Sequence, residues 1–340
     1  MQAEEKTNSQ YLSRSNSECL KGIFAVCVLM HHLYQYSGIL RGTIIAYIFE
    51  SMGYLSVSVF FFISGYGLMA SYSTKGNHYI KQFPRTRLLP YYCVIVFLIV
   101  IYTIENIILK NEITMISVVK SLISSDTVVF FGWYLQVQLL LYIIFLIVFS
   151  ICKTQKLQLG FLFTYVMVYC AVSFLSGVTA TAYESVFSFV LGFVWYAKKA
   201  RIDSLLRDGK RWLWLVVSTL FLVYGLVSLS FCNISSIVIV ICKMLSAVLF
   251  VVLVMLLVNK IRVDYRLTRL LGTMSLDIYV VQGLFIVLLR SKLIYISNPY
   301  FYIVLVIIGT AVGAVLIHPI IRYIYKMCGR KMVQSQTVSA

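Results

Sequence analysis

Two ionisable residues, Lys21 and His32, stand eleven positions apart in an otherwise apolar stretch near the start of the chain. At about 100° per helical residue, eleven steps return to within about 20° of the starting direction, so both side chains would lie on one helix face. A positioned imidazole can take a proton from a hydroxyl near neutral pH. The pair therefore indicates a polar track that leads to a general base. The alternative is a histidine that only hydrogen-bonds a neighbouring helix. His31 points about 100° away, and we keep it as a second candidate catalytic residue.

A pair of arginines forms a second candidate site. Arg85 and Arg87 lie in the segment Phe83-Pro-Arg-Thr-Arg-Leu-Leu-Pro90, at the end of an expected loop over 73–87. Guanidinium groups match phosphate oxygens through paired hydrogen bonds. Two arginines at the mouth of a cavity would suit a polyanionic cytosolic ligand. The alternative is that they only fix the topology.

Other ionisable residues fall inside or at the ends of apolar segments, where an unpartnered charge costs about 3 kcal/mol or more. Lys243 needs a carboxylate or water, and both Asp277 and Glu184 are candidate partners. The sequence does not specify a functional role for Lys243, Asp277 or His318. The eight cysteines show no C-x-x-C or metal-ligand spacing, so no metal is expected.

Long apolar segments must position these groups. The chain is 61% hydrophobic and 12% charged, whereas a soluble domain is nearer half apolar and a quarter charged. A helix of about 20 residues spans the roughly 30 Å hydrocarbon core. The sequence therefore predicts an all-α polytopic membrane protein with about ten transmembrane helices. The expected helices are 20–39, 52–72, 87–106, 130–151, 158–177, 182–198, 212–230, 234–259, 270–290 and 299–325.

The basic residues favour alternate connections between these helices. Of the 29 Lys and Arg residues, 23 lie in one set of connections, which includes both termini, and 5 lie in the other. The positive-inside rule then places both termini in the cytoplasm. The net charge of +17 is a topology signal, because a nucleic-acid binder would cluster it on a soluble face. We expect cytoplasmic tails over 1–19 and 327–340 around a transmembrane domain over 20–326.

Several phrases, in order along the chain, resemble those of membrane acyltransferase family 3. The segment from Leu20 to His32 is similar to the opening helix of that family, in which a basic residue precedes a histidine by eleven positions. The other similar phrases are Phe60-Phe-Phe-Ile-Ser-Gly-Tyr-Gly67, Arg87-Leu-Leu-Pro90, Trp133-Tyr-Leu135 and Gly272-Thr-Met-Ser-Leu-Asp-Ile-Tyr279.

The resemblance implies a bacterial cytoplasmic-membrane enzyme that transfers an acetyl or related group from acyl-CoA to a hydroxyl. Its acceptor would be a sugar of a surface polysaccharide or a lipid-linked glycan, and its other partner is membrane lipid. The family histidine maps onto His32 and the basic residue onto Lys21. We expect Lys21, Arg85 and Arg87 to bind the phosphates of coenzyme A. Arg85 and Arg87 are two apart rather than the usual three, and Gln282 stands near the place of a late family histidine.

The main alternative is a transporter or flippase for a glycan or lipid that uses the same polar residues. Such proteins are often built from internal repeats, and the sequence shows none. No sequence feature specifies an oligomeric state.

Overall fold

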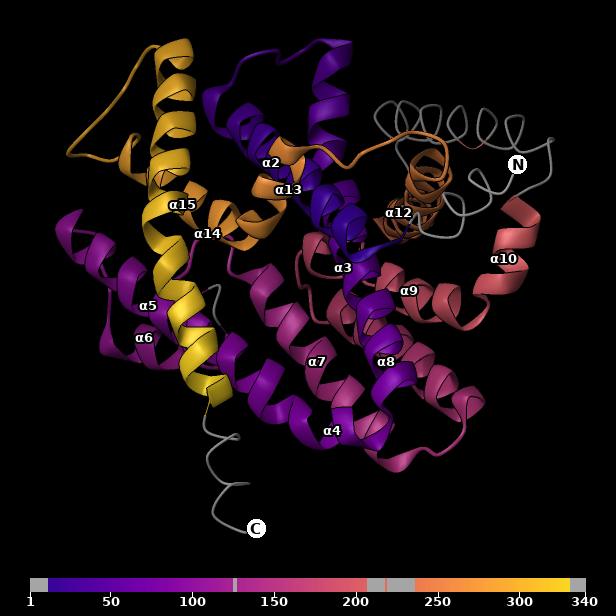
Figure 1. Cartoon of the computed structure of the whole chain (residues 1–340). Helices are drawn as coiled ribbons and strands as arrows, with labels where there is room; N and C mark the ends of the chain where they lie inside the picture. Colours follow the sequence, from indigo (N-terminus) through magenta and orange to yellow (C-terminus); the bar gives the residue numbers. More distant parts are fainter. Residues whose placement is uncertain (1–11, 125–126, 207–217, 219–235, 331–340) are drawn as a thin grey trace. The chain divides into compact units, whose positions relative to one another are not determined.

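The structure is a computed structural model that describes residues 12–124, 127–206, 218 and 236–330 (Figure 1). Within these residues the chain is helical, and its only strand-like pairing is an isolated bridge between Arg290 and Tyr295. The all-α prediction is therefore confirmed. Among the described residues, six helices are long and apolar enough to cross a membrane, or seven if one bent helix pair counts as a span.

Three of the ten expected spans are not among these seven. The helix α2 (Arg14–Ser37) is long enough, but Lys21, His31 and His32 make it more polar than the others. The helix α9 (Phe187–Ala197) has 11 residues and is roughly 16 Å long, too short to cross alone. The expected helix over 212–230 lies outside the described residues.

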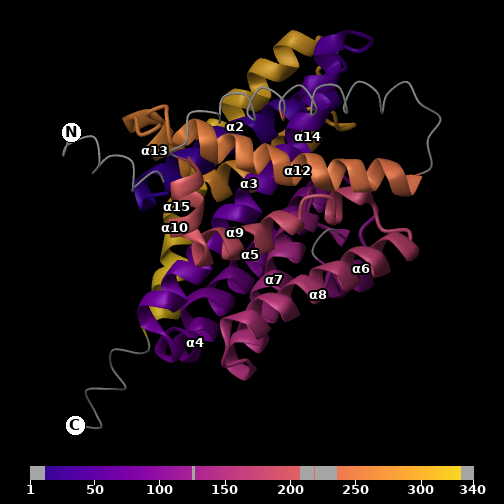
Figure 2. The ribbon, with the colours of Figure 1, turned by 90° about the vertical axis from the view of Figure 1, so that its right-hand side faces the viewer.

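The chain divides into two compact units. The first contains most of α2 and α3 (Ile44–Lys75), together with α8 (Gln155–Leu175), α9, α10 (Lys199–Leu206), α12 (Ser236–Val258) and α13 (Arg266–Thr273). In this unit α9 packs against both α8 and α12 (Figure 2). Gly65 and Gly192 let α3 and α9 meet backbone to backbone, because a Cβ on Gly192 would stand 2.6 Å from the nitrogen of Tyr66.

The second unit is built around α5 (Leu89–Ile108). Its other elements are α4 (Asn77–Phe83), a π-helical turn (Pro84–Leu88), α6 (Met115–Ser121), α7 (Trp133–Ile151), α14 (Ser275–Leu288) and α15 (Pro299–Arg330). The long helix α15 packs against α5 (Figure 1). The buried hydroxyl of Tyr102 on α5 donates to the carbonyl of Val280 on α14 at 2.8 Å. This bond joins α14 to α5.

The expected loop over 73–87 is wrong. Gly76, with a positive φ of 54°, separates α3 from α4, and the chain is then helical from Asn77 to Ile108. Pro84 has no N–H and would clash with the preceding turn of an α-helix. The chain accommodates it by widening to a π turn, in which the N–H of Leu89 donates to the Pro84 carbonyl. Arg85 and Arg87 therefore stand on a helical turn.

The expected helix over 270–290 is broken. It consists of α13 and α14, which meet at Met274 with a bend of 68°. No proline causes this bend.

Candidate functional site

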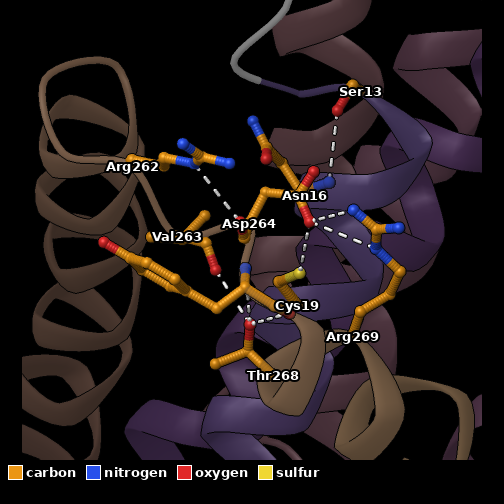
Figure 3. A network of polar contacts seen from close by, with 9 residues as sticks. Ser13, Asn16, Cys19, Arg262, Val263, Asp264, Thr268 and Arg269 are labelled. Carbon is orange, nitrogen blue, oxygen red and sulfur yellow. Dashed lines mark hydrogen bonds and ion pairs between the residues drawn. The ribbon is translucent and has the colours of Figure 1, made fainter.

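The first turns of α2 are fixed by a polar network with the segment 262–269 of the same unit (Figure 3). Asp264 accepts hydrogen bonds from Arg269 Nε at 3.2 Å and Nη2 at 2.5 Å, and from Cys19 Sγ at 3.6 Å. The Arg269 guanidinium holds the pKa of the Asp264 carboxyl below its usual range. Because Cys19 lies two residues before Lys21, this network also orients the start of the candidate polar track.

Two glycines let α2 and α13 touch through their backbones. A Cβ on Gly22 would stand 2.6 Å from the nitrogen of Gly272 and would also meet the carbonyl oxygen of Thr268. A Cβ on Gly272 would overlap the carbonyl of Glu18. These neighbours are backbone atoms, which cannot move aside as the far end of a flexible side chain can. The N-terminal half of α2 is therefore rigidly seated.

The histidine and lysine of the first helix lie as their spacing predicts. The helix α2 is unbroken from Arg14 to Ser37, so Lys21 and His32 share one face about three turns apart. His32 is buried, with 7% of its surface exposed, and Lys21 is half-buried. A buried imidazole can meet a substrate away from bulk water, as a general base in the bilayer would have to.

His31 contacts a different helix. Its Nδ1 lies 2.8 Å from the carbonyl oxygen of Phe49 on α3. Because a carbonyl only accepts, Nδ1 carries the hydrogen of this bond, and Nε2 is the acceptor nitrogen of the neutral ring. The ring lies over Gly53, where an added Cβ would stand 2.5 Å from Nε2. His31 thus joins α2 to α3.

A buried ion pair lies in the same unit. Lys243 Nζ on α12 is 3.1 Å from Glu184 Oε2, and the Glu184 side chain is only 2% exposed. The ammonium also lies 5.4 Å from the ring centroid of Tyr54. Of the two partners that the sequence offered for Lys243, Glu184 is therefore the one that binds it. The His31 ring also interacts electrostatically with Lys243 and with Glu50.

The sequence reading missed Glu50 and Tyr54 as parts of this polar cluster. The expected span began at residue 52, whereas α3 begins at Ile44, so Glu50 lies within the helix. The apolar run Ile-Ile-Ala-Tyr-Ile-Phe over 44–49 was the signal that could have extended the span.

The second unit holds Arg85 and Arg87, both exposed on the π turn. The Arg87 charge acts on Tyr325 of α15, which also interacts electrostatically with Tyr142 of α7. Neither Arg85 nor Arg87 has an ion pair within the described part of the chain. The two arginines differ in that Arg87 interacts electrostatically with the hydroxyl group of Tyr325.

The second unit also contains an Asp–His pair. His318 Nδ1 on α15 lies 2.6 Å from Asp277 Oδ2 on α14, and the Asp277 side chain is 2% exposed. Asp277 is thus the partner of His318 rather than of Lys243. Gln282, the residue near the expected place of a family histidine, is fully buried on α14, and its amide has no hydrogen-bond partner among the described residues.

Each candidate group is positioned within its own unit. Lys21, His31 and His32 lie on α2 in the first, and Arg85 and Arg87 lie on the π turn in the second. Over the described ranges, no group of three or more His, Cys, Asp or Glu side chains is arranged to hold a metal ion.

Comparison with protein families identifies the chemistry. A family model described as an acyltransferase domain matches residues 14–318. The chain belongs to this acyltransferase family. The match runs from the first residue of α2 to the histidine of the Asp–His pair, so it includes every candidate residue above. With six or seven candidate spans in the part that the structure describes, the protein is a multi-pass membrane acyltransferase. The comparisons with curated proteins and with solved structures gave no match.

Proposed function

We propose that this acyltransferase moves an acetyl or related acyl group from cytosolic acyl-CoA to a hydroxyl of a surface polysaccharide or lipid-linked glycan. The observation that supports the proposal best is the buried imidazole of His32, on the face of α2 that also carries Lys21. Both residues lie within the region that the acyltransferase family model matches.

In this proposal His32 is the general base. Its imidazole takes the proton of the acceptor hydroxyl while the hydroxyl oxygen attacks the thioester carbonyl carbon. A carbon–oxygen bond forms, the carbon–sulfur bond breaks, and the proton passes from the imidazolium to the sulfur of coenzyme A. The products are an ester and a free thiol. General-base catalysis of this kind contributes about 10²–10⁴-fold to the rate.

Basic side chains bind the donor. Lys21, at the end of α2 that the charge distribution places on the cytoplasmic side, and the arginines Arg85 and Arg87 contact the phosphates of coenzyme A through charge-assisted hydrogen bonds. His31 is a positioning residue in this scheme, because its bond to the Phe49 carbonyl holds α2 against α3.

Release of coenzyme A thiol by the purified full-length protein tests the proposal. Acetyl-CoA is supplied with and without a glycan acceptor, and wild type is compared with His32→Ala. His78→Ala, which removes an exposed histidine of α4, is the matched control. We expect His32→Ala to lose about 10²–10⁴-fold in acceptor-dependent turnover, and His78→Ala to retain it. Equal turnover in wild type and His32→Ala would refute the proposed base, and glycan movement without thioester cleavage would indicate a transporter.

Two further measurements refine the mechanism. Histidine can also act as a nucleophile, and an acyl-histidine relay would leave one acyl group on the protein when acceptor is withheld. Intact-mass spectrometry of the protein after exposure to acetyl-CoA alone distinguishes this relay from direct transfer. Mass spectrometry of the surface glycans of a strain lacking the gene then identifies the acceptor by its missing acyl group.

A further inference from the structure

Arg290, in the loop just after α14 in the second unit, stacks on two tyrosine rings. Its guanidinium carbon lies 4.5 Å from the ring centroid of Tyr302 and 5.2 Å from that of Tyr295. Tyr302 is buried on α15, and its hydroxyl donates to the carbonyl of Ile286 at 3.1 Å. One of the two rings is therefore fixed in the helical core of the unit.

The loop between α14 and α15 keeps the second ring in place. Arg290 and Tyr295 form an antiparallel backbone bridge, and the N–H of Ile296 donates to the carbonyl of Leu289 at 3.0 Å. The Ser291 hydroxyl accepts bonds from two backbone N–H groups further along the same loop. The loop is thus a compact turn that holds the guanidinium in one position.

This guanidinium lacks a counter-charge within the described part of the chain. Arg290 is half-buried and makes no ion pair there; its guanidinium hydrogen-bonds the Tyr302 side chain, but its buried Nε has no hydrogen-bond acceptor. A charge withdrawn from water without a partner is costly. A planar guanidinium that is already held in place also loses little freedom when it binds an oxyanion. Both facts favour an anion as its missing partner.

Further aromatic side chains lie near this group. The Tyr36 ring is 5.7 Å from that of Phe130 and 6.1 Å from that of Phe131, and it interacts electrostatically with Tyr302. Tyr36 is 40% exposed and Tyr295 is 66% exposed. Exposed aromatic rings offer an apolar face with a polar edge, which suits the alternating C–H and hydroxyl groups of a sugar.

We propose that Arg290, with Tyr295 and Tyr302, binds the phosphate or carboxylate of an anionic saccharide acceptor. The inference rests on the proposed function, because it assigns the acceptor's chemical class. It also uses the expected topology, which places Arg290 on the side of the membrane opposite the termini. A phosphate-bearing lipid-linked sugar and an acidic polysaccharide unit both meet this description.

Ligand binding to the full-length protein in detergent tests the inference without turnover. Isothermal titration calorimetry with glucose 1-phosphate, neutral glucose, inorganic phosphate and a short-chain anionic phospholipid is compared for wild type and Arg290→Gln. Lys292→Gln is the matched control, because Lys292 is an exposed cation two residues away in the same loop. We expect Arg290→Gln to weaken glucose 1-phosphate binding about tenfold to a hundredfold, since bonds to charged groups contribute about 1.5–3 kcal/mol. Lys292→Gln should bind glucose 1-phosphate as wild type does. Any binding of neutral glucose should not depend on Arg290.

Two results would overturn the inference. One is equal affinity of Arg290→Gln and Lys292→Gln for the sugar phosphate. The other is an Arg290-dependent affinity for the phospholipid or for inorganic phosphate that the sugar phosphate does not share, which would indicate a headgroup or free-ion site. If Arg290→Gln fails to fold, Arg290→Lys takes its place. This variant keeps the charge but not the planar fork, so it should bind the sugar phosphate with an affinity between that of wild type and that expected for Arg290→Gln. Arg290-dependent sugar binding without His32-dependent thioester cleavage would refute the proposed function alone.

Discussion

Removing the ammonium of Lys243 should destabilise the protein more than removing the carboxylate of Glu184, although the two form one ion pair. Their charged atoms are 3.1 Å apart, and the side chains are 33% and 2% exposed, respectively. At an effective dielectric constant of about 20, the direct attraction at this distance is about 5 kcal/mol. The exposure difference decides which single substitution costs more.

Lys243→Met leaves a carboxylate that is almost completely buried and has lost its counter-charge, which costs about 3–5 kcal/mol. Glu184→Gln leaves an ammonium that is less buried than the carboxylate and can still donate to the amide oxygen, so the cost is about 1 kcal/mol. The double variant contains no charge at this position. It should therefore recover much of the stability that Lys243→Met loses.

Thermal unfolding of the four proteins in one detergent, followed by tryptophan fluorescence, measures this order. The expected midpoints decrease from wild type to Glu184→Gln to Lys243→Met, with the double variant above Lys243→Met. Lys260→Met, at an exposed site just after α12, is the control for loss of a lysine and should unfold close to wild type. A larger loss for Glu184→Gln than for Lys243→Met, or additive losses in the double variant, would refute the reasoning from burial.

Two further predictions concern the surroundings of α2. Gly53→Ala places a methyl group against the His31 ring, so acyl transfer should fall several-fold. Gly67→Ala on the same helix is the control, because its methyl group meets no atom within 4 Å and should leave turnover unchanged. Equal turnover of the two variants would contradict the positioning role of His31. Because Arg269 lowers the pKa of Asp264, the stabilisation from this pair is complete above the usual Asp value of about 3.9 and is lost as the pH falls through the lower folded value. The unfolding midpoint of Asp264→Asn should therefore change less than that of wild type below about pH 4, and parallel pH profiles would exclude a contribution from the pair.

The parts of the site that depend on local helical geometry could be predicted from the sequence. The shared face of Lys21 and His32 follows from a spacing of eleven residues within one helix, and α2 is indeed unbroken across both. The cost of a lone charge in an apolar helix likewise predicted that Lys243 would have a partner. These inferences needed no knowledge of how the helices pack.

The parts that depend on packing could not be predicted. Composition made Glu184 and Asp277 equal candidates for Lys243, and only the packing of α9 and α12 within one unit decides for Glu184. No proline precedes the bend at Met274, so the sequence did not predict it. The bend follows Gly272, which packs directly against the Glu18 carbonyl. The expected loop over 73–87 contains Pro84, which the structure accommodates by a π turn within a helix.

Two cations of this protein make the same aromatic contact but differ in their counter-charge. Lys243 lies 5.4 Å from the Tyr54 ring centroid and is paired with Glu184, whereas Arg290 lies 4.5 Å from that of Tyr302 and has no carboxylate partner in the described chain. An aromatic ring contributes about 0.5–2 kcal/mol to binding a cation, which offsets only part of the cost of withdrawing a charge from water. The fold supplies an internal anion in the first case. For Arg290, an anion brought by the acceptor would complete the same arrangement.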